Sequence, residues 1–171
     1  LRDHPGTMVV AAGGIVTGRQ MAASLAMGAS GVWTGSVWLA TSESEASQVF
    51  QVKMIAATSR QTIRSRSRTG KPSRQLRSDW TDAWEQKGSP DALPMPLQQL
   101  ISIPAFDRID KAAQGGGEGP RSLVTYFVGQ GVGLIDNVRT CRQVVEDFMA
   151  DFVDGCESVA ASLDALGGNQ R

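Results

Sequence analysis

Two short apolar runs end in glycines and small residues that can approach a phosphate group. The first run leads into Gly13 and Gly14, and the second leads into Gly35 and Ser36. Glycine allows close approach of the backbone to a ligand, and free N–H groups at a helix start can donate to phosphate oxygens. The Ser36 hydroxyl is a further donor. These residues predict a phosphorylated ligand, with a cofactor as the first candidate; plain packing turns between strands and helices are the alternative.

Two β-strands, near residues 8–12 and 32–35, must position these glycines. The segment between them reads as one amphipathic helix, with Thr17 as its N-cap and Gly28 at its end. Barrel enzymes build a phosphate site from the turns after their last two strands. The sequence therefore predicts an α/β fold: the C-terminal part of a (β/α)8 TIM barrel, comprising its last two βα units, followed by a mainly helical extension.

These segments resemble the nitronate monooxygenases, formerly called 2-nitropropane dioxygenases, which are FMN-dependent (β/α)8-barrel enzymes. Residues 10–19, 22–29 and 31–36 carry the resemblance, which continues in patches through residues 65–77 and 129–135. It implies FMN as the cofactor. It also implies that the flavin site includes Gly13, Gly14, Trp33, Thr34, Gly35 and Ser36. Serine replaces the family's usual threonine at 36, whereas Trp33 and Thr34 stand where the family more often has Gln and Met.

The resemblance also implies an activity, the FMN-dependent oxidation of alkyl nitronates, small-molecule substrates. In that family a histidine upstream of this segment takes the substrate's proton or positions its anion. His4 is the sole histidine of the chain and precedes the first strand, in a loop expected at the opposite end of the barrel. We therefore assign no catalytic residue and no metal ligand in this chain.

Two other functions remain open. Flavin-dependent enoyl-acyl-carrier-protein reductases share the barrel and similar glycine pairs but use a nicotinamide donor. An inactive piece acting only as an interaction module is the non-enzymatic alternative. Ala12 stands where barrels of the hydroxyacid-oxidase and inosine-monophosphate-dehydrogenase types usually have Asp, which argues against both of those types.

The length sets a limit on the fold. A (β/α)8 barrel needs about 200 to 250 residues, and this chain has 171. We therefore expect the C-terminal part of a longer enzyme, inactive as an isolated fragment. We expect three segments: the last two βα units over 1–60, a basic, loop-rich helical extension over 61–121, and a C-terminal segment with a long amphipathic helix over 122–171.

Composition gives no reason to expect nucleic acid or a membrane as a partner. The formal net charge is zero, and no run of 18 apolar residues is present. The chain reads as cytoplasmic. Residues 60–77 are rich in arginine, and we expect them to be solvated or to pair with the acidic final helix or with ligand phosphate. Cys141 and Cys156 lie on one expected helix, too far apart for a disulfide.

Further helices follow from periodicity. We expect a helix over 42–59 with Ser42 or Ser44 as its cap, and one helix face carrying Trp80 and Trp84. Residues 97–103 read as a helix or turn, and residues 112–120 as a mobile loop. The turn at 129–133 either starts a helix or brings Gln130 to the active-site mouth. The apolar stripe of the final helix packs on the barrel or on a partner subunit, which leaves a homodimer open.

Overall fold

A parallel pair of short strands begins the fold of the computed structural model, which describes residues 4 and 6–167. Strand β1 (Val10–Ala12) pairs with β2 (Gly31–Trp33), and helix α1 (Gly18–Ala26) connects them. Thr17 caps α1 by accepting a hydrogen bond from the Gln20 backbone N–H. Gly28, with a φ of 97°, follows the end of α1. The predicted strand–helix–strand unit is therefore present, with slightly shorter strands.

The next two helices differ from the prediction. Helix α2 (Ser36–Leu39) directly follows β2, and helix α3 (Gln48–Ile55) is capped by Ser47. The prediction of one helix over 42–59 capped by Ser42 or Ser44 is wrong. The residues before α3 are held in turns by the start of the final helix, because the Ser42 N–H donates to the Arg139 carbonyl and Glu43 accepts from the Cys141 N–H. A short 3-10 turn, η1 (Ser59–Gln61), comes after α3.

An antiparallel hairpin lies in the segment that we expected to be loop-rich and helical. Strand β3 (Thr62–Ser65) pairs with β4 (Ser73–Leu76), with Arg64 opposite Arg74. Ser65, Gln75 and Leu76 are buried in this hairpin. Because arginine and serine fill four of these eight positions, the apolar alternation typical of a half-buried strand is missing from the sequence.

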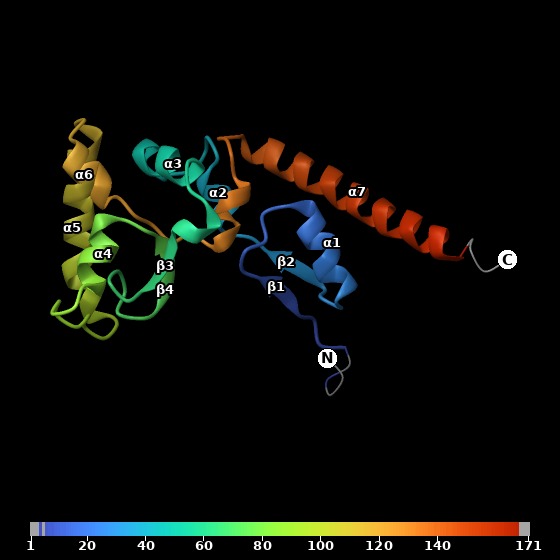
Figure 1. Ribbon diagram of the computed structural model, residues 1–171, viewed down its shortest axis with the longest axis horizontal. Coiled ribbons are helices and arrows are strands. Elements are labelled where there is room, and N and C mark those ends of the chain that lie inside the picture. Colours follow the sequence, from blue (N-terminus) through green and yellow to red (C-terminus); the bar gives the residue numbers. More distant parts are fainter. Residues whose placement is uncertain (1–3, 5, 168–171) are drawn as a thin grey trace.

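Three helices pack beside the hairpin: α4 (Asp79–Glu85), α5 (Leu97–Gln114) and α6 (Glu118–Leu123) (Figure 1). Trp80 and Trp84 share one face of α4, as predicted, and the Trp80 ring packs 4.8 Å from that of Phe106 on α5. Helix α5 is longer than the 97–103 stretch expected from the sequence and contains Pro104. Most of the expected loop at 112–120 is taken up by the end of α5 and the start of α6.

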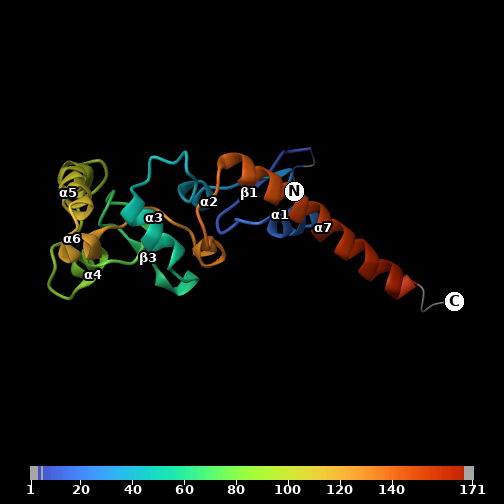
Figure 2. The same cartoon turned by 90° about the horizontal axis from the view of Figure 1, so that it is seen from above.

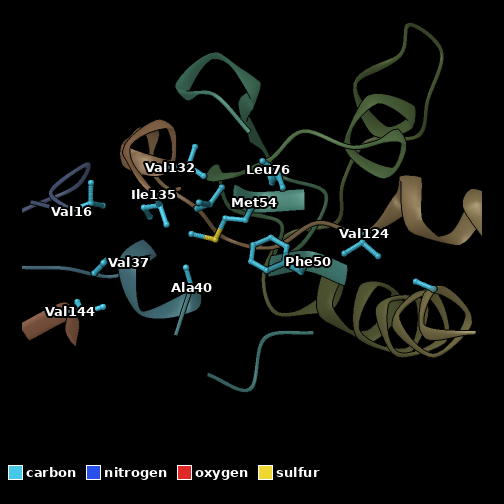
Figure 3. Close-up of a cluster of buried hydrophobic side chains, with 12 residues drawn as sticks. Val16, Val37, Ala40, Phe50, Met54, Leu76, Val124, Val132, Ile135 and Val144 are labelled. Carbon is cyan, nitrogen blue, oxygen red and sulfur yellow. The ribbon is translucent and has the colours of Figure 1, made fainter. Parts of the chain in front are cut away.

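The chain then returns to the first strands. A 3-10 turn, η2 (Gln130–Leu134), packs near η1 and α2, and the long helix α7 (Cys141–Gly167) lies against α1. All three predicted segments contribute to one buried cluster, which Figure 3 shows around Met54 and Phe50. Its members from distant parts of the chain include Val16, Val37, Leu76, Val124, Val132, Ile135 and Val144.

Helix α7 extends beyond the rest of the molecule in two perpendicular views (Figures 1 and 2). Its first half packs closely on α1: a Cβ atom on Gly18 would lie 2.0 Å from the Phe148 carbonyl oxygen. Further along, the apolar stripe is exposed, with Leu163 63% and Leu166 71% accessible. None of the described helices is long and apolar enough to cross a membrane.

Candidate functional site

The carboxyl ends of the two parallel strands bring both glycine turns to one edge of the fold. Gly13 and Gly14 follow β1 and have φ values of 95° and 76°, a region that favours glycine. Gly35 and Ser36 follow β2, so the parallel register of the strands places the two turns side by side. A Cβ atom on Gly13, Gly14 or Gly35 would meet no protein atom within 4 Å. The described protein thus leaves open space in front of these backbones.

The turns offer hydrogen-bond donors to that space. Within the described part of the chain, the backbone N–H groups of Gly14, Gly35 and Ser36 donate to no protein acceptor. The Ser36 Oγ accepts a hydrogen bond from the Gly129 N–H at 2.8 Å. Because a hydroxyl that accepts still has its own hydrogen, Ser36 can donate to a ligand at the same time.

Gly129, which was not predicted from the sequence to belong to the site, forms a third wall. A Cβ atom at this position would lie 3.4 Å from the Ser36 Oγ and 3.5 Å from the Gly14 backbone nitrogen. Gly131 approaches even more closely, because its Cβ would lie 2.7 Å from the Gly14 carbonyl oxygen. We call Gly13, Gly14, Gly35, Ser36 and Gly129 the glycine site.

Gln20 holds the first turn of the glycine site in place. Its Nε2 donates to the Gly14 carbonyl oxygen at 3.0 Å, and its Oε1 accepts from the Val16 N–H at 2.8 Å and the Thr17 N–H at 3.2 Å. This role of Gln20 was not predicted from the sequence. Gln20 stands three residues after the N-cap Thr17, the spacing of a capping box, and that signal was available in the sequence.

A pocket of ≈ 420 Å³ adjoins the glycine site on the side of η1 and η2. Gly14 and Gln20 line it on one side, and Thr58, Ser59 and Gln130 line it on the other. Gln130 begins the 3-10 helix η2 and also lines this pocket. The lining residues offer amides and hydroxyls without a charged side chain.

The other residues considered in the sequence analysis lie at different distances from the glycine site. Trp33 ends β2 with its side chain 74% exposed, and the Thr34 Oγ1 accepts a hydrogen bond from the Trp38 Nε1 at 2.9 Å. His4 lies in a bend before β1, at the end of the strand opposite to the glycine site. The exposed Arg77 pairs with Asp82 on α4, so its partner is not the acidic final helix.

Comparison with known proteins identifies the family. The family model described as nitronate monooxygenase matches residues 7–151, which include every residue of the glycine site. This chain belongs to the nitronate monooxygenase family. The predicted resemblance is confirmed.

Relatives of the nitronate monooxygenase family match most of this chain. A protein of Mycobacterium tuberculosis named as a monooxygenase is 56% identical over 149 residues, which is 86% of this chain and 40% of the relative. A nitronate monooxygenase of Metarhizium robertsii is 33% identical over 153 residues, or 84% of this chain and 41% of the relative. The chain thus spans about two fifths of the length of these relatives.

Two solved structures of TIM-barrel enzymes are similar to this family member. Nitroalkane oxidase from Streptomyces ansochromogenes matches with a TM-score of 0.76 and 26% identity, over 92% of this chain and 43% of that one. FabK from Thermotoga maritima matches with a TM-score of 0.69 and 30% identity, over 92% of this chain and 48% of that one. The fold is accordingly mixed α/β and similar to about half of each neighbour.

Proposed function

We propose that this chain supplies the flavin phosphate site of an FMN-dependent nitronate monooxygenase, an oxidoreductase that oxidises alkyl nitronates. The proposal depends on one observation: the backbones of Gly14 and Gly129 and the Ser36 hydroxyl lie next to one another. Membership of the nitronate monooxygenase family and the names of its relatives support a flavin as the ligand.

The donor set of the glycine site fits a phosphate group. The N–H groups of Gly14, Gly35 and Ser36 and the Ser36 hydroxyl can donate to phosphate oxygens, and open space lies before them. Backbone donors fixed by a turn lose little freedom on binding. Gln20 orients the Gly14 peptide from behind, which makes it a positioning residue. Trp33 and Thr34, at the end of β2, are the remaining proposed contacts of the flavin.

The arrangement of β1, α1, β2 and α2 supports the predicted fold assignment. We infer that these elements are the last two βα units of a (β/α)8 barrel, because parallel strands that end in phosphate-binding turns occupy that place in barrel enzymes. The exposed apolar residues of β1 support this assignment, since a two-stranded sheet alone leaves one face and its edges without partners.

FMN, when bound, would accept the electrons removed from the substrate. The chain's own part in the reaction is to bind the phosphate end of the cofactor and fix its position. We propose that the group that accepts the substrate's proton lies outside this chain, because His4 lies at the end of β1 opposite to the glycine site.

A flavin-dependent enoyl-acyl-carrier-protein reductase is the second candidate, and the structural likeness to FabK favours it. The glycine site serves both enzymes equally, because it would bind the same end of the same cofactor. The electron donor therefore distinguishes them: a nitronate in the first case and a nicotinamide in the second.

The test is the visible absorbance of the complete gene product, recorded without oxygen before and after adding an alkyl nitronate and, in a second sample, before and after adding reduced nicotinamide. We expect a flavin spectrum that bleaches on addition of the nitronate. A flavin spectrum that bleaches only with reduced nicotinamide would favour the reductase. A protein that binds no flavin would overturn both candidates and support an interaction module.

A further inference from the structure

A second pocket lies away from the glycine site and shares no residue with it. Its volume is ≈ 390 Å³. Apolar walls come from Leu39, Phe50 and Tyr126, and polar groups come from Ser47, Arg68 and Asp110. Elements on both sides of the molecule contribute, because α2 and α3 meet the β3–β4 loop and α5 here. The proposed flavin site makes no use of this pocket.

Arg68 is the unusual side chain of this pocket. Its guanidinium carbon lies 3.9 Å from the ring centre of Phe106 and 4.6 Å from that of Tyr126. Stacking on aromatic faces fixes the plane of the guanidinium group. Its Nη1 donates to the Thr125 carbonyl oxygen at 3.1 Å. Arg68 is therefore held rigidly in one orientation.

The guanidinium group is incompletely paired. Arginine carries five N–H donors, and among the described residues the Thr125 carbonyl is the one acceptor that Arg68 reaches. Arg68 forms no ion pair with a described carboxylate. Half-buried cations are costly without a partner, and burial lowers the pKa of Arg68. The remaining donors and the positive charge are available to an anion that enters the pocket.

Two hydroxyl groups across the pocket add further donors. Ser47 Oγ accepts from the Phe50 N–H, and Ser44 Oγ accepts from the Ala46 N–H. Each hydroxyl keeps its own hydrogen for a ligand. Planar carboxylates match the fork of a guanidinium group in two parallel hydrogen bonds.

We propose that this pocket binds a small carboxylate with an apolar body, anchored by Arg68. The carboxylate accepts hydrogen bonds from Arg68 and the serine hydroxyls, and the apolar body packs against Leu39, Phe50 and Tyr126. Asp110 lines the same pocket and opposes the bound charge. Glu45 also lines it, but its side chain is exposed and water screens its charge.

The test uses benzoate, a planar carboxylate on an apolar ring, with benzamide as the uncharged control. Calorimetric titration of the complete gene product gives the affinity, and the NMR resonance of the Arg68 Nε–H reports the site. We expect benzoate to bind more tightly than benzamide. Arg68→Lys keeps the charge but loses the fork, so benzoate should bind about tenfold more weakly. Arg64→Lys, at an exposed position on β3, is the matched control and should change nothing.

Asp110→Asn tests whether the carboxylate binds beside Asp110. It removes a negative charge beside the proposed carboxylate, so benzoate should bind more tightly in this variant. If Asp110→Asn binds benzoate no more tightly than the unchanged protein, the carboxylate does not lie beside Asp110, and the proposal is wrong. Equal binding of benzoate and benzamide, or an Arg68→Lys variant with unchanged affinity, would also overturn it. Unfolding by urea shows whether each variant keeps its fold.

Discussion

At the scale of single residues, the glycine site depends on the absence of side chains at three separate turns. Gly14 needs glycine because of its φ of 76°, whereas Gly129, with a φ of −83° and ψ of 170°, has a conformation that any residue adopts. Glycine at 129 is therefore explained by space rather than by conformation. A Cβ there would stand beside the Ser36 hydroxyl and the Gly14 N–H.

Gly129→Ala gives a sharp test of the glycine site. The nearest atoms would lie 3.4–3.9 Å from the new methyl, which is ordinary contact, so the free energy of unfolding should change little. The methyl should nevertheless crowd a phosphate held by Gly14 and Ser36. We expect FMN binding to weaken by roughly tenfold or more, because overpacking costs about 1–3 kcal/mol and about 1.4 kcal/mol corresponds to a factor of ten. Fluorescence titration of the complete gene product with FMN measures the effect.

Gly35→Asp tests the same site through charge. A carboxylate at 35 would face the phosphate, and a Cβ there meets no protein atom within 4 Å, so FMN binding should be lost while the fold survives. Gly31→Asp is the matched control, because Gly31 lies at the other end of β2 and also has open space beside it. Retention of FMN by Gly35→Asp would show that the phosphate binds elsewhere.

Asp110 predicts a pH dependence of stability. Burial raises the pKa of Asp110 above its usual value of 3.8, although the nearby Arg68 lowers it. The folded state therefore keeps this proton to a higher pH than the unfolded chain does. The contribution of Asp110 to the free energy of unfolding should fall as the pH rises through this window. Urea unfolding between about pH 3.5 and 6 gives the free energy of unfolding as a function of pH, and its slope should be less negative for Asp110→Asn than for the unchanged chain. Identical slopes would contradict a raised pKa of Asp110.

At the scale of elements, close contact between α1 and α7 fixes the end of the molecule that carries the glycine site. Gly18 begins α1, and a Cβ on it would lie 2.0 Å from the Phe148 carbonyl oxygen and 2.3 Å from the Phe152 nitrogen. These are backbone atoms of a helix and cannot rotate away. The two helices can approach this closely because residue 18 has no side chain.

Gly18→Ala should therefore destabilise the chain. Alanine favours a helix by about 1 kcal/mol over glycine, but here the clash forces α1 and α7 apart, at a cost of about 1–3 kcal/mol or more. Gly119→Ala in α6 has no atom within 4 Å of the new methyl, so it should be neutral or stabilising. The midpoints of thermal unfolding of the two variants are compared. Equal midpoints would mean that the helices do not pack as described.

Sequence patterns predicted some elements well and others poorly. Thr17 and Gly28 delimit α1 because cap residues act locally. The hairpin of β3 and β4 was missed, since its strands have no apolar alternation and are stabilised by contacts with distant segments, such as the Leu76 N–H with the Tyr126 carbonyl. The cap of α3 was misplaced because residues around 140 hold the preceding turns.

At the scale of the whole molecule, large apolar side chains are exposed in two regions: around β1, β2 and α7, and along α5, where Leu100 is 74% exposed. Met8 is 83% exposed and Trp33 74% exposed, and the distal part of α7 exposes Leu163 and Leu166. Large apolar patches on a protein surface mark sites of contact with other protein. This distribution supports the proposed place of the chain within a larger barrel.

The isolated 171-residue chain should bind the hydrophobic dye ANS through these exposed residues. Replacing Leu163 and Leu166 together by serine should lower dye fluorescence. The free energy of unfolding should change by less than about 0.5 kcal/mol per site, because exposed positions contribute little to stability. A loss of about 2 kcal/mol or more would instead mean that these side chains are buried in solution, for example between two copies of the chain.

The sequence by itself determined the family, the βα unit around α1 and the two glycine turns that follow β1 and β2. These features are local: each depends on residues within a few positions of one another and on strand pairing at short range. Only the tertiary structure showed that Gly129, more than ninety residues after Ser36, donates to its hydroxyl and closes the glycine site. It alone brought Arg68 onto the rings of Phe106 and Tyr126. Such contacts depend on how distant segments pack, and the spacing of residues along the chain carries no record of that packing.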